Sequence, residues 1–412
     1  MDEYISQEQH RTEVAALNHE IIRLTKKLEQ NEKEHIQSAI PDKQDPFGNP
    51  TEYHEYNDDY TKIFPQLEAP GCRIPLEPGY EERRRLKRFY KIGGWSIVIH
   101  FLASQLIATG IAALISLLLS GRNPDADADA IYTYMKSSSI LAAITMIVYL
   151  ITNVGCALIG LKLSKTSLSS LTRTRNFSFG TAVQYCLSAL FIWVISGFIS
   201  VGINDIFEKY GYSTDVMDTE GMAVTGTGIA IMAIYNCIVA PITEELFFRG
   251  MLLKIFSRAN QRFGVFATAV FFGLAHGNIP QFLLAFSLGI LLAHITLRHC
   301  SIIPSIIVHM FVNTLVMVIG LLEPEGSTMI IVTLIIQVAA AVGMLLLISF
   351  CTHNRLPSTT PAQSRRGLSV ASNSLLISLI FWIQVANLIF LIIFNMNIFT
   401  CVTNLIDKFM NS

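Results

Sequence analysis

Residues 241–250 place two adjacent carboxylates, Glu244 and Glu245, and one cation, Arg249, in an otherwise apolar stretch. Across residues 221–322 these two glutamates are the only acidic residues. A charged side chain at bilayer depth costs about 3 kcal/mol or more, so it persists where it faces the protein interior and takes part in chemistry, transport or pairing. This segment is therefore the first candidate for a functional site.

Helical geometry predicts different roles for the two carboxylates. Glu245 and Arg249 lie four residues apart, on one face of a helix, where they can neutralise each other. Glu244 is rotated by about 100° from that face, because a helix has about 3.6 residues per turn. We therefore expect Glu245 to pair with Arg249 and Glu244 to remain free to accept a proton. The alternative is a solvated helix end outside the membrane, where such ion pairs are common.

Two apolar segments downstream also carry polar side chains at helical spacing. One has Phe272 and His276 on one face, and the other has His309 and Asn313 on one face. Glu244 and His276 lie equally far along the chain from the basic turn expected between them, so two antiparallel helices would hold them at similar height. Buried polar groups in lipid need partners, and we expect these groups to be partners of one another.

Such a cluster is suited to activating a water molecule. Glu244 would accept a proton from water as a general base, and His276 would hold that water or carry the proton. His309 and Asn313 would donate hydrogen bonds to the oxyanion formed at a carbonyl. The expected substrate is a peptide near or within the membrane, since its carbonyl must reach this depth. One glutamate and two histidines could also hold zinc, although the chain contains no HExxH sequence.

The three motifs, in this order, resemble those of the CPBP family of intramembrane glutamate proteases, which includes CAAX-prenyl endopeptidases and bacterial bacteriocin-processing and immunity-type proteins. The motifs are EExxxR (Glu244, Glu245, Arg249), FxxxH (Phe272, His276) and HxxxN (His309, Asn313). The resemblance covers roughly residues 226–320, and the stretches FFRGMLL, FFGLAHGN and PSIIVHMFVN are similar to bacterial members. It implies an endopeptidase that needs no metal or other cofactor. The implied catalytic residues are Glu244, His276, His309 and Asn313, supported by Glu245, Arg249 and Phe272.

The composition is typical of a multi-pass membrane protein. The 412 residues are 51% hydrophobic and 15% charged, with a mean hydropathy of +0.46. The expected fold class is all-α, a polytopic transmembrane helix bundle of about nine spans with a polar, partly disordered N-terminal cytoplasmic region. Spans are expected at residues 94–120, 138–161, 177–203, 227–250, 263–276, 281–297, 301–321, 327–350 and 372–399. Seven scattered cysteines indicate no disulfide framework and no zinc module.

Loop charges predict the orientation in the cell membrane. Six basic residues within residues 83–91 precede the first span, and the following loops alternate between acidic and basic. By the positive-inside bias, the amino terminus is expected in the cytoplasm and the carboxyl terminus outside. The basic cluster is also suited to contact anionic lipid headgroups.

We expect five regions along the chain. They are a cytoplasmic helix at residues 1–36, a proline-rich tether with the basic cluster at 37–92, N-terminal spans at 93–225, a catalytic core at 226–321 and C-terminal spans at 322–412. The first helix carries an apolar seam with alternate spacings of three and four, formed by Val14, Leu17, Ile21, Leu24 and Leu28. The seam is consistent with self-association and equally with an amphipathic surface helix.

Three function classes remain open on the sequence. An endopeptidase leads, with a membrane-associated peptide or protein and the lipid bilayer as partners and no nucleic acid. A non-catalytic scaffold or bacteriocin-immunity protein would not need the full set of base and oxyanion donors. A proton-coupled transporter would also bury glutamate and histidine, but such proteins often contain repeats, and no second copy of the acidic segment occurs.

Two further residues in or near the spans carry expectations. His100 is expected to be a core or interfacial histidine whose hydrogen bonds are satisfied. Pro241 is expected to free the Cys237 carbonyl.

Overall fold

The computed structural model describes residues 13–28, 80–122, 128–137, 139–164, 166, 168–209, 226–257, 261–276, 279–322 and 325–354. All regular elements in these ranges are helical, which confirms the all-α prediction. Seven helices are long and apolar enough to cross a membrane: Arg88–Arg122, Ile140–Leu163, Phe179–Ile206, Gly226–Phe256, Gln281–His299, Ile303–Leu322 and Gly326–His353. The shorter apolar helix Gln261–Leu274 is an eighth predicted segment. The ninth, residues 372–399, lies outside the described residues.

The helices follow the apolar runs of the sequence closely. They are α2 (Tyr80–Arg122), α3 (Ala128–Ser137), α4 (Ile140–Leu163), the short η2 (Leu168–Thr172), α5 (Phe179–Lys209), α6 (Gly226–Ile234), α7 (Ala240–Glu245), α8 (Lys254–Phe256), α9 (Gln261–Leu274), α10 (Ile279–His299), α11 (Ile303–Leu322) and α12 (Gly326–His353). Two π-helical segments, η4 (Tyr235–Val239) and η5 (Leu246–Leu253), lie on either side of α7. The π segments were not expected from the sequence, and the short helices α3 and η2 lie in stretches expected to be loops.

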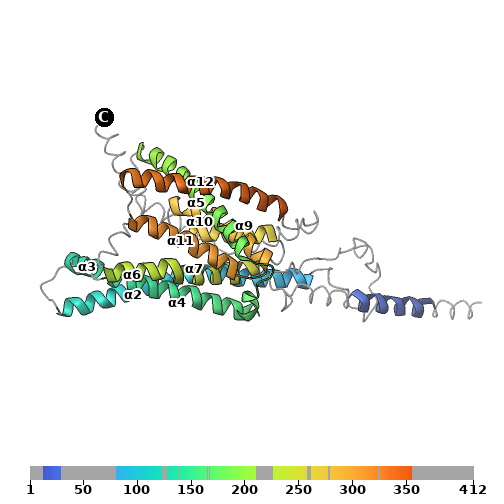
Figure 1. Cartoon of the computed structure of the whole chain (residues 1–412). Coiled ribbons are helices and arrows are strands. Elements are labelled where there is room, and N and C mark those ends of the chain that lie inside the picture. Colours follow the sequence, from blue (N-terminus) through green and yellow to red (C-terminus); the bar gives the residue numbers. More distant parts are fainter. Residues whose placement is uncertain are drawn as a thin grey trace, which may run out of the picture.

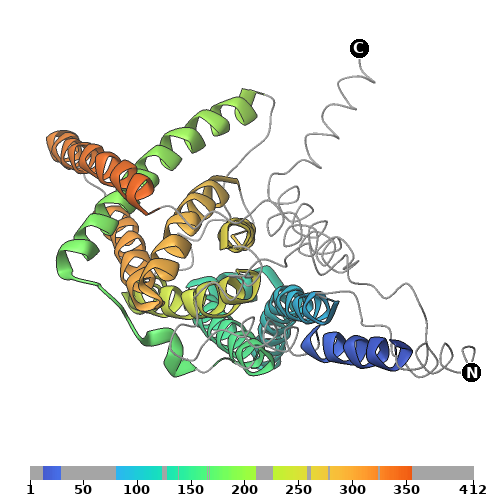
Figure 2. The same ribbon diagram turned by 90° about the vertical axis from the view of Figure 1, so that its right-hand side faces the viewer.

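The segment from α6 to α8 lies in the middle of the bundle. On one side it contacts α4 and α2, and on the other it contacts α9, α10 and α11 (Figures 1 and 2). Helices α5 and α12 pack against each other on the far side of α10 and α11. The largest group of buried apolar residues surrounds η5 and α8. The acidic segment is therefore held by packing from both halves of the bundle.

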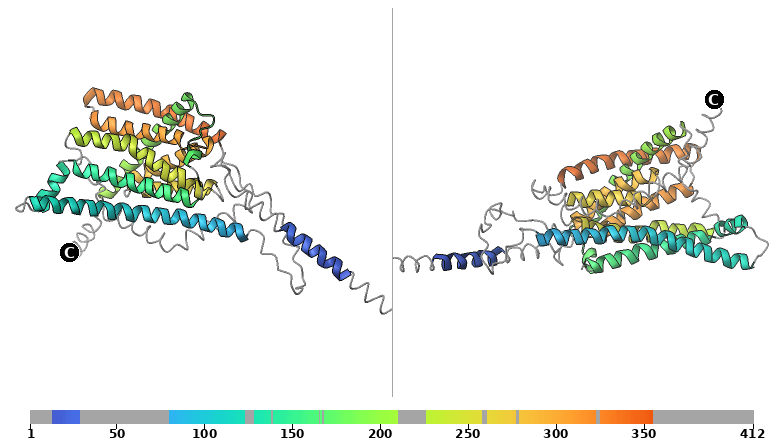
Figure 3. Two further views of the ribbon diagram at one scale, coloured as in Figure 1. Left: turned by 90° about the horizontal axis from the view of Figure 1, so that it is seen from below. Right: turned by 180° about the vertical axis from the view of Figure 1, so that it is seen from behind.

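The first membrane helix extends beyond its apolar part. α2 begins at Tyr80 and runs along one edge of the bundle (Figure 3). Residues 83–91, which carry the basic cluster, are therefore part of this helix. Residues 29–79 lie outside the described part of the chain. Residues 13–28 form a helix, as predicted, and its self-association remains a prediction.

A close approach of two backbones joins α12 to α5. A Cβ atom added at Gly343 would overlap the carbonyl oxygen of Leu187. We expect Gly343→Ala to lower the free energy of unfolding by about 1–3 kcal/mol, because the two helices must separate to admit the methyl group. Thermal unfolding in detergent measures the change. Gly197→Ala, on α5 where an added Cβ meets no atom within 4 Å, is the control, and equal melting of both variants would contradict the prediction.

Candidate active site

The acidic pair and the following arginine form a buried ion pair at the centre of the bundle. Arg249 Nη1 donates to Glu245 Oε1 over 2.7 Å, and both side chains are almost completely buried. This confirms the predicted pairing. The guanidinium carbon of Arg249 also lies 4.2 Å from the centroid of the Phe272 ring, in cation–π geometry. The first two motifs therefore contact each other through Arg249 and Phe272.

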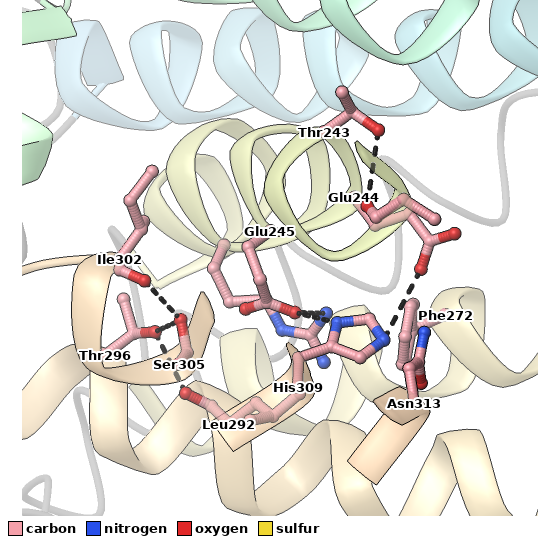
Figure 4. Close-up of polar contacts among 12 residues, drawn as sticks. Thr243, Glu244, Glu245, Phe272, Leu292, Thr296, Ile302, Ser305, His309 and Asn313 are labelled. Atoms are coloured by element: carbon pink, nitrogen blue, oxygen red, sulfur yellow. Dashed lines mark hydrogen bonds and ion pairs between the residues drawn. The ribbon is translucent and has the colours of Figure 1, made fainter. Parts of the chain in front are cut away.

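His309 joins the third motif to both carboxylates (Figure 4). Its Nδ1 lies 3.1 Å from Glu245 Oε1, and its Nε2 lies 3.8 Å from Glu244 Oε2. Because the Glu245 carboxylate accepts this bond as well as the one from Arg249, the Nδ1 of His309 carries a proton. The start of α11 is tied down by Ser305, whose hydroxyl donates to the carbonyl of Ile302. His309 is thus fixed in orientation and points its second nitrogen at Glu244.

His276 comes to the same site from the end of α9. Its Nδ1 donates to the carbonyl of Phe272 over 2.8 Å, and the two rings pack edge to face. The imidazole is close enough to interact electrostatically with Glu244, Arg249 and His309. The three motifs thus meet in space, as the sequence led us to expect. The bond from Nδ1 to the backbone fixes the orientation of the ring.

The two glutamates have different surroundings despite being adjacent. The Glu245 side chain is fully buried, whereas 19% of the Glu244 side chain is exposed. Two phenols interact electrostatically with Glu244: Tyr235 at the start of η4 and Tyr149 on α4. The centroids of their rings lie 6.3 Å apart. Neither tyrosine could be predicted as part of the site, since tyrosine is common in apolar helices and no motif marks these two.

Asn313 satisfies a backbone carbonyl that the helix itself leaves without a donor. The N–H of Ala240 donates to the carbonyl of Tyr235, five residues back, as in a π-helix. The carbonyl of Asn236 could accept a hydrogen bond from residue 240 or residue 241 of the same helix. The N–H of Ala240 is already bonded to Tyr235, and Pro241 has no N–H. Asn313 Nδ2 donates to that carbonyl over 2.9 Å. The distortion next to Pro241 takes the form of a π-helical segment, and the carbonyl that Asn313 binds is that of Asn236.

This arrangement predicts that the contribution of Asn313 depends on Pro241. Asn313→Leu leaves the carbonyl of Asn236 unpaired, so we expect it to lower the free energy of unfolding by about 1–3 kcal/mol. In a Pro241→Ala background the loss should be smaller, because the new N–H can bond to the helix carbonyls. Thermal unfolding of the two single variants and the double variant measures this coupling. Additive losses would show that the two residues act independently.

The side chains of the site are of types that can bind a metal ion. Among the residues that the structure describes, no group of three or more His, Cys, Asp or Glu side chains is arranged to hold a metal ion. His309 Nδ1 and His276 Nδ1 are both engaged with protein oxygens.

The segment that carries the three motifs is similar in sequence to known proteins. Residues 226–315 match the family model of type II CAAX prenyl endopeptidase Rce1-like proteins. The chain is 29% identical over 140 residues to a Bacillus subtilis (strain 168) protein named "Putative membrane peptidase YdiL". That alignment covers 32% of this chain and 57% of the relative. No solved structure matches the chain significantly. The matched range contains all seven motif residues, and both matches support the similarity of this region to the CPBP/CAAX protease family.

Proposed function

We propose that the protein is an intramembrane endopeptidase that hydrolyses peptide bonds of membrane-associated peptides or proteins. The observation that carries the proposal is the contrast between the two adjacent carboxylates. Glu245 is sealed between Arg249 and His309, whereas Glu244 is partly exposed and faces Nε2 of His309. A carboxylate that is held in place yet reachable by water is suited to act as a general base.

In this mechanism Glu244 takes a proton from water while the water oxygen attacks the peptide carbonyl carbon. His276, oriented through its Nδ1, holds the water from Nε2. The tetrahedral oxyanion accepts hydrogen bonds from the second amide N–H of Asn313 and from His309, which in its cationic form donates from both nitrogens. As the intermediate collapses, the C–N bond breaks and the proton on Glu244 passes to the leaving amine.

The proposal is tested by comparing the termini of membrane proteins in cells that express the wild type or Glu244→Gln at equal levels. The substitution keeps the shape of the side chain and removes the base. We expect a set of new termini in wild-type cells that is missing with Glu244→Gln. Asp205→Asn, the same chemical change at an exposed carboxylate on α5, is the control and should leave the set intact. Identical termini in all three strains would favour the scaffold or immunity alternative.

The orientation of the chain is a second part of the proposal. The amino terminus faces the cytoplasm, which places the end of α2 outside and the end of α12 inside. In a variant without native cysteines, we expect Arg122→Cys to react with a membrane-impermeant maleimide in intact cells. Asn354→Cys should react only after the cells are opened. The reverse pattern would invert the topology.

A further inference from the structure

A chain of three buried polar side chains connects the first membrane helix to the helix that carries Glu244. His100 on α2 bonds through Nε2 to Oδ1 of Asn153 on α4 over 2.6 Å. Asn153 Nδ2 donates to Thr243 Oγ1 over 3.1 Å, and the Thr243 hydroxyl donates to the carbonyl of Ala240. All three side chains are buried. This series of hydrogen-bonded side chains ends in α7 at Thr243, one residue before Glu244.

The hydrogen bonds that link His100, Asn153 and Thr243 all run in the same direction, with each residue donating to the next. The Asn153 amide nitrogen donates toward Thr243, so its oxygen must accept, and His100 carries its proton on Nε2. His100 Nδ1 has no hydrogen-bond partner among the described residues, and the ring stacks on Phe247 with centroids 4.7 Å apart. The buried, unpartnered Nδ1 favours the neutral imidazole, since a proton there would be a buried donor without an acceptor. The hydrogen bonds are therefore ordered from α2 toward α7.

Packing alone does not account for this arrangement. Burying polar groups is costly in an apolar bundle, and apolar side chains of similar volume would fill the same space without that cost. Each bond in the chain also joins two different helices or fixes the first turn of α7. On α4, Asn153 lies one turn from Tyr149, which interacts with Glu244. One face of α4 thus contacts both the residue before Glu244 and the surroundings of its carboxylate.

We propose that His100 and Asn153 are positioning residues, which hold Thr243 and the first turn of α7 so that the Glu244 carboxylate faces His309. Both lie outside residues 226–315, the range matched by the family model. The functional unit therefore includes α2 and α4 as well as the family domain. The effect on catalysis rests on the proposed function, whereas the effect on the geometry of Glu244 does not.

The geometry of Glu244 can be tested without a substrate, in full-length protein in lipid nanodiscs. Dicyclohexylcarbodiimide is an apolar reagent that modifies buried carboxylic acids, and mass spectrometry locates the label. We expect wild-type protein to be labelled at Glu244 and not at the sealed Glu245. His100→Leu and Asn153→Leu should change the labelling rate of Glu244 by at least about threefold. His100→Gln, which keeps a donor near the position of Nε2, should restore the wild-type rate.

The matched control is Thr152→Val, a buried polar residue on α4 that bonds only within its own helix. It should leave the labelling rate unchanged. If His100→Leu does not fold, Thr243→Val removes the acceptor of Asn153 at nearly constant volume and serves instead. Variants that melt like the wild type and are labelled at the wild-type rate would overturn the proposal.

The same variants separate this inference from the proposed function. With a substrate identified from the termini, we expect His100→Leu and Asn153→Leu to lower kcat at least about tenfold with little change in KM, because misplacing the base affects the chemical step. His100→Gln should recover most of kcat. If Glu244→Gln removes no termini, the proposed function fails, while the labelling experiment still decides the positioning role. Wild-type kcat in folded His100→Leu would exclude that role.

Discussion

Glu244→Gln is expected to lower kcat by about 100- to 10,000-fold, the usual contribution of a general base, and to leave the protein folded. The amide cannot accept the proton from water, but it occupies the same space. The Glu244 side chain is partly exposed, and its contact with His309 Nε2 is 3.8 Å long, so no tight ion pair among the described residues is lost. Stability should therefore change by less than about 1 kcal/mol.

Turnover in nanodiscs and thermal unfolding of the same preparation measure the two effects. Glu245→Gln is the informative comparison, because it makes the same chemical change one residue away. We expect Glu245→Gln to lower the melting temperature strongly, whereas Glu244→Gln should not. Turnover near the wild-type level in Glu244→Gln would exclude Glu244 as the general base. A large loss of stability in that variant would show that Glu244 has a structural role.

Breaking the buried ion pair is expected to have the largest effect on stability. Glu245→Gln or Arg249→Met should each lower the free energy of unfolding by about 3–5 kcal/mol, because each leaves a charged group buried without its counter-charge. Arg249 is 1% exposed, and besides Glu245 its charge interacts with the rings of Phe272 and Phe248 and, at longer range, with Glu244. The double variant buries no charge at this point, so it should be more stable than the sum of the two losses predicts.

A double-mutant cycle measured by thermal unfolding gives the coupling between the two residues. We expect a coupling free energy of about 2 kcal/mol or more, which is in the upper part of the range measured for pairs of residues in contact. Arg249→Lys tests whether charge alone suffices: a lysine keeps the charge but lacks the planar group that lies over Phe272. Additive losses would contradict the predicted ion pair, and full stability of Arg249→Lys would show that the cation–π contact contributes nothing.

Local features of the site could be predicted from the sequence because they depend on helical geometry within one segment. The spacing of Glu245 and Arg249 places them on one face, and the structure contains that ion pair. Eight of the nine expected apolar segments are helices in the described residues. Length and composition are enough to predict these helices, because a segment in lipid must form all its backbone hydrogen bonds internally. An apolar stretch of spanning length is therefore helical.

The backbone geometry around Pro241 could be predicted only in part. The missing N–H of proline is visible in the sequence, and a local distortion follows from it. Whether the chain responds with a kink or with a π-helical segment depends on which neighbouring group can serve the freed carbonyls. In this protein Asn313 on α11 donates to Asn236, so the packing of another helix decided the outcome.

The membrane helices, the acidic pair and the order of the three motifs follow from residue type and local spacing, so they could be predicted without a structure. The bond between Glu245 and His309, and the approach of Tyr149, Asn153 and His100 to the acidic segment from other helices, became visible only in the folded protein. Contacts between helices depend on which faces meet and at what depth. Apolar membrane helices carry little information about either, because lipid and protein interior favour the same side chains.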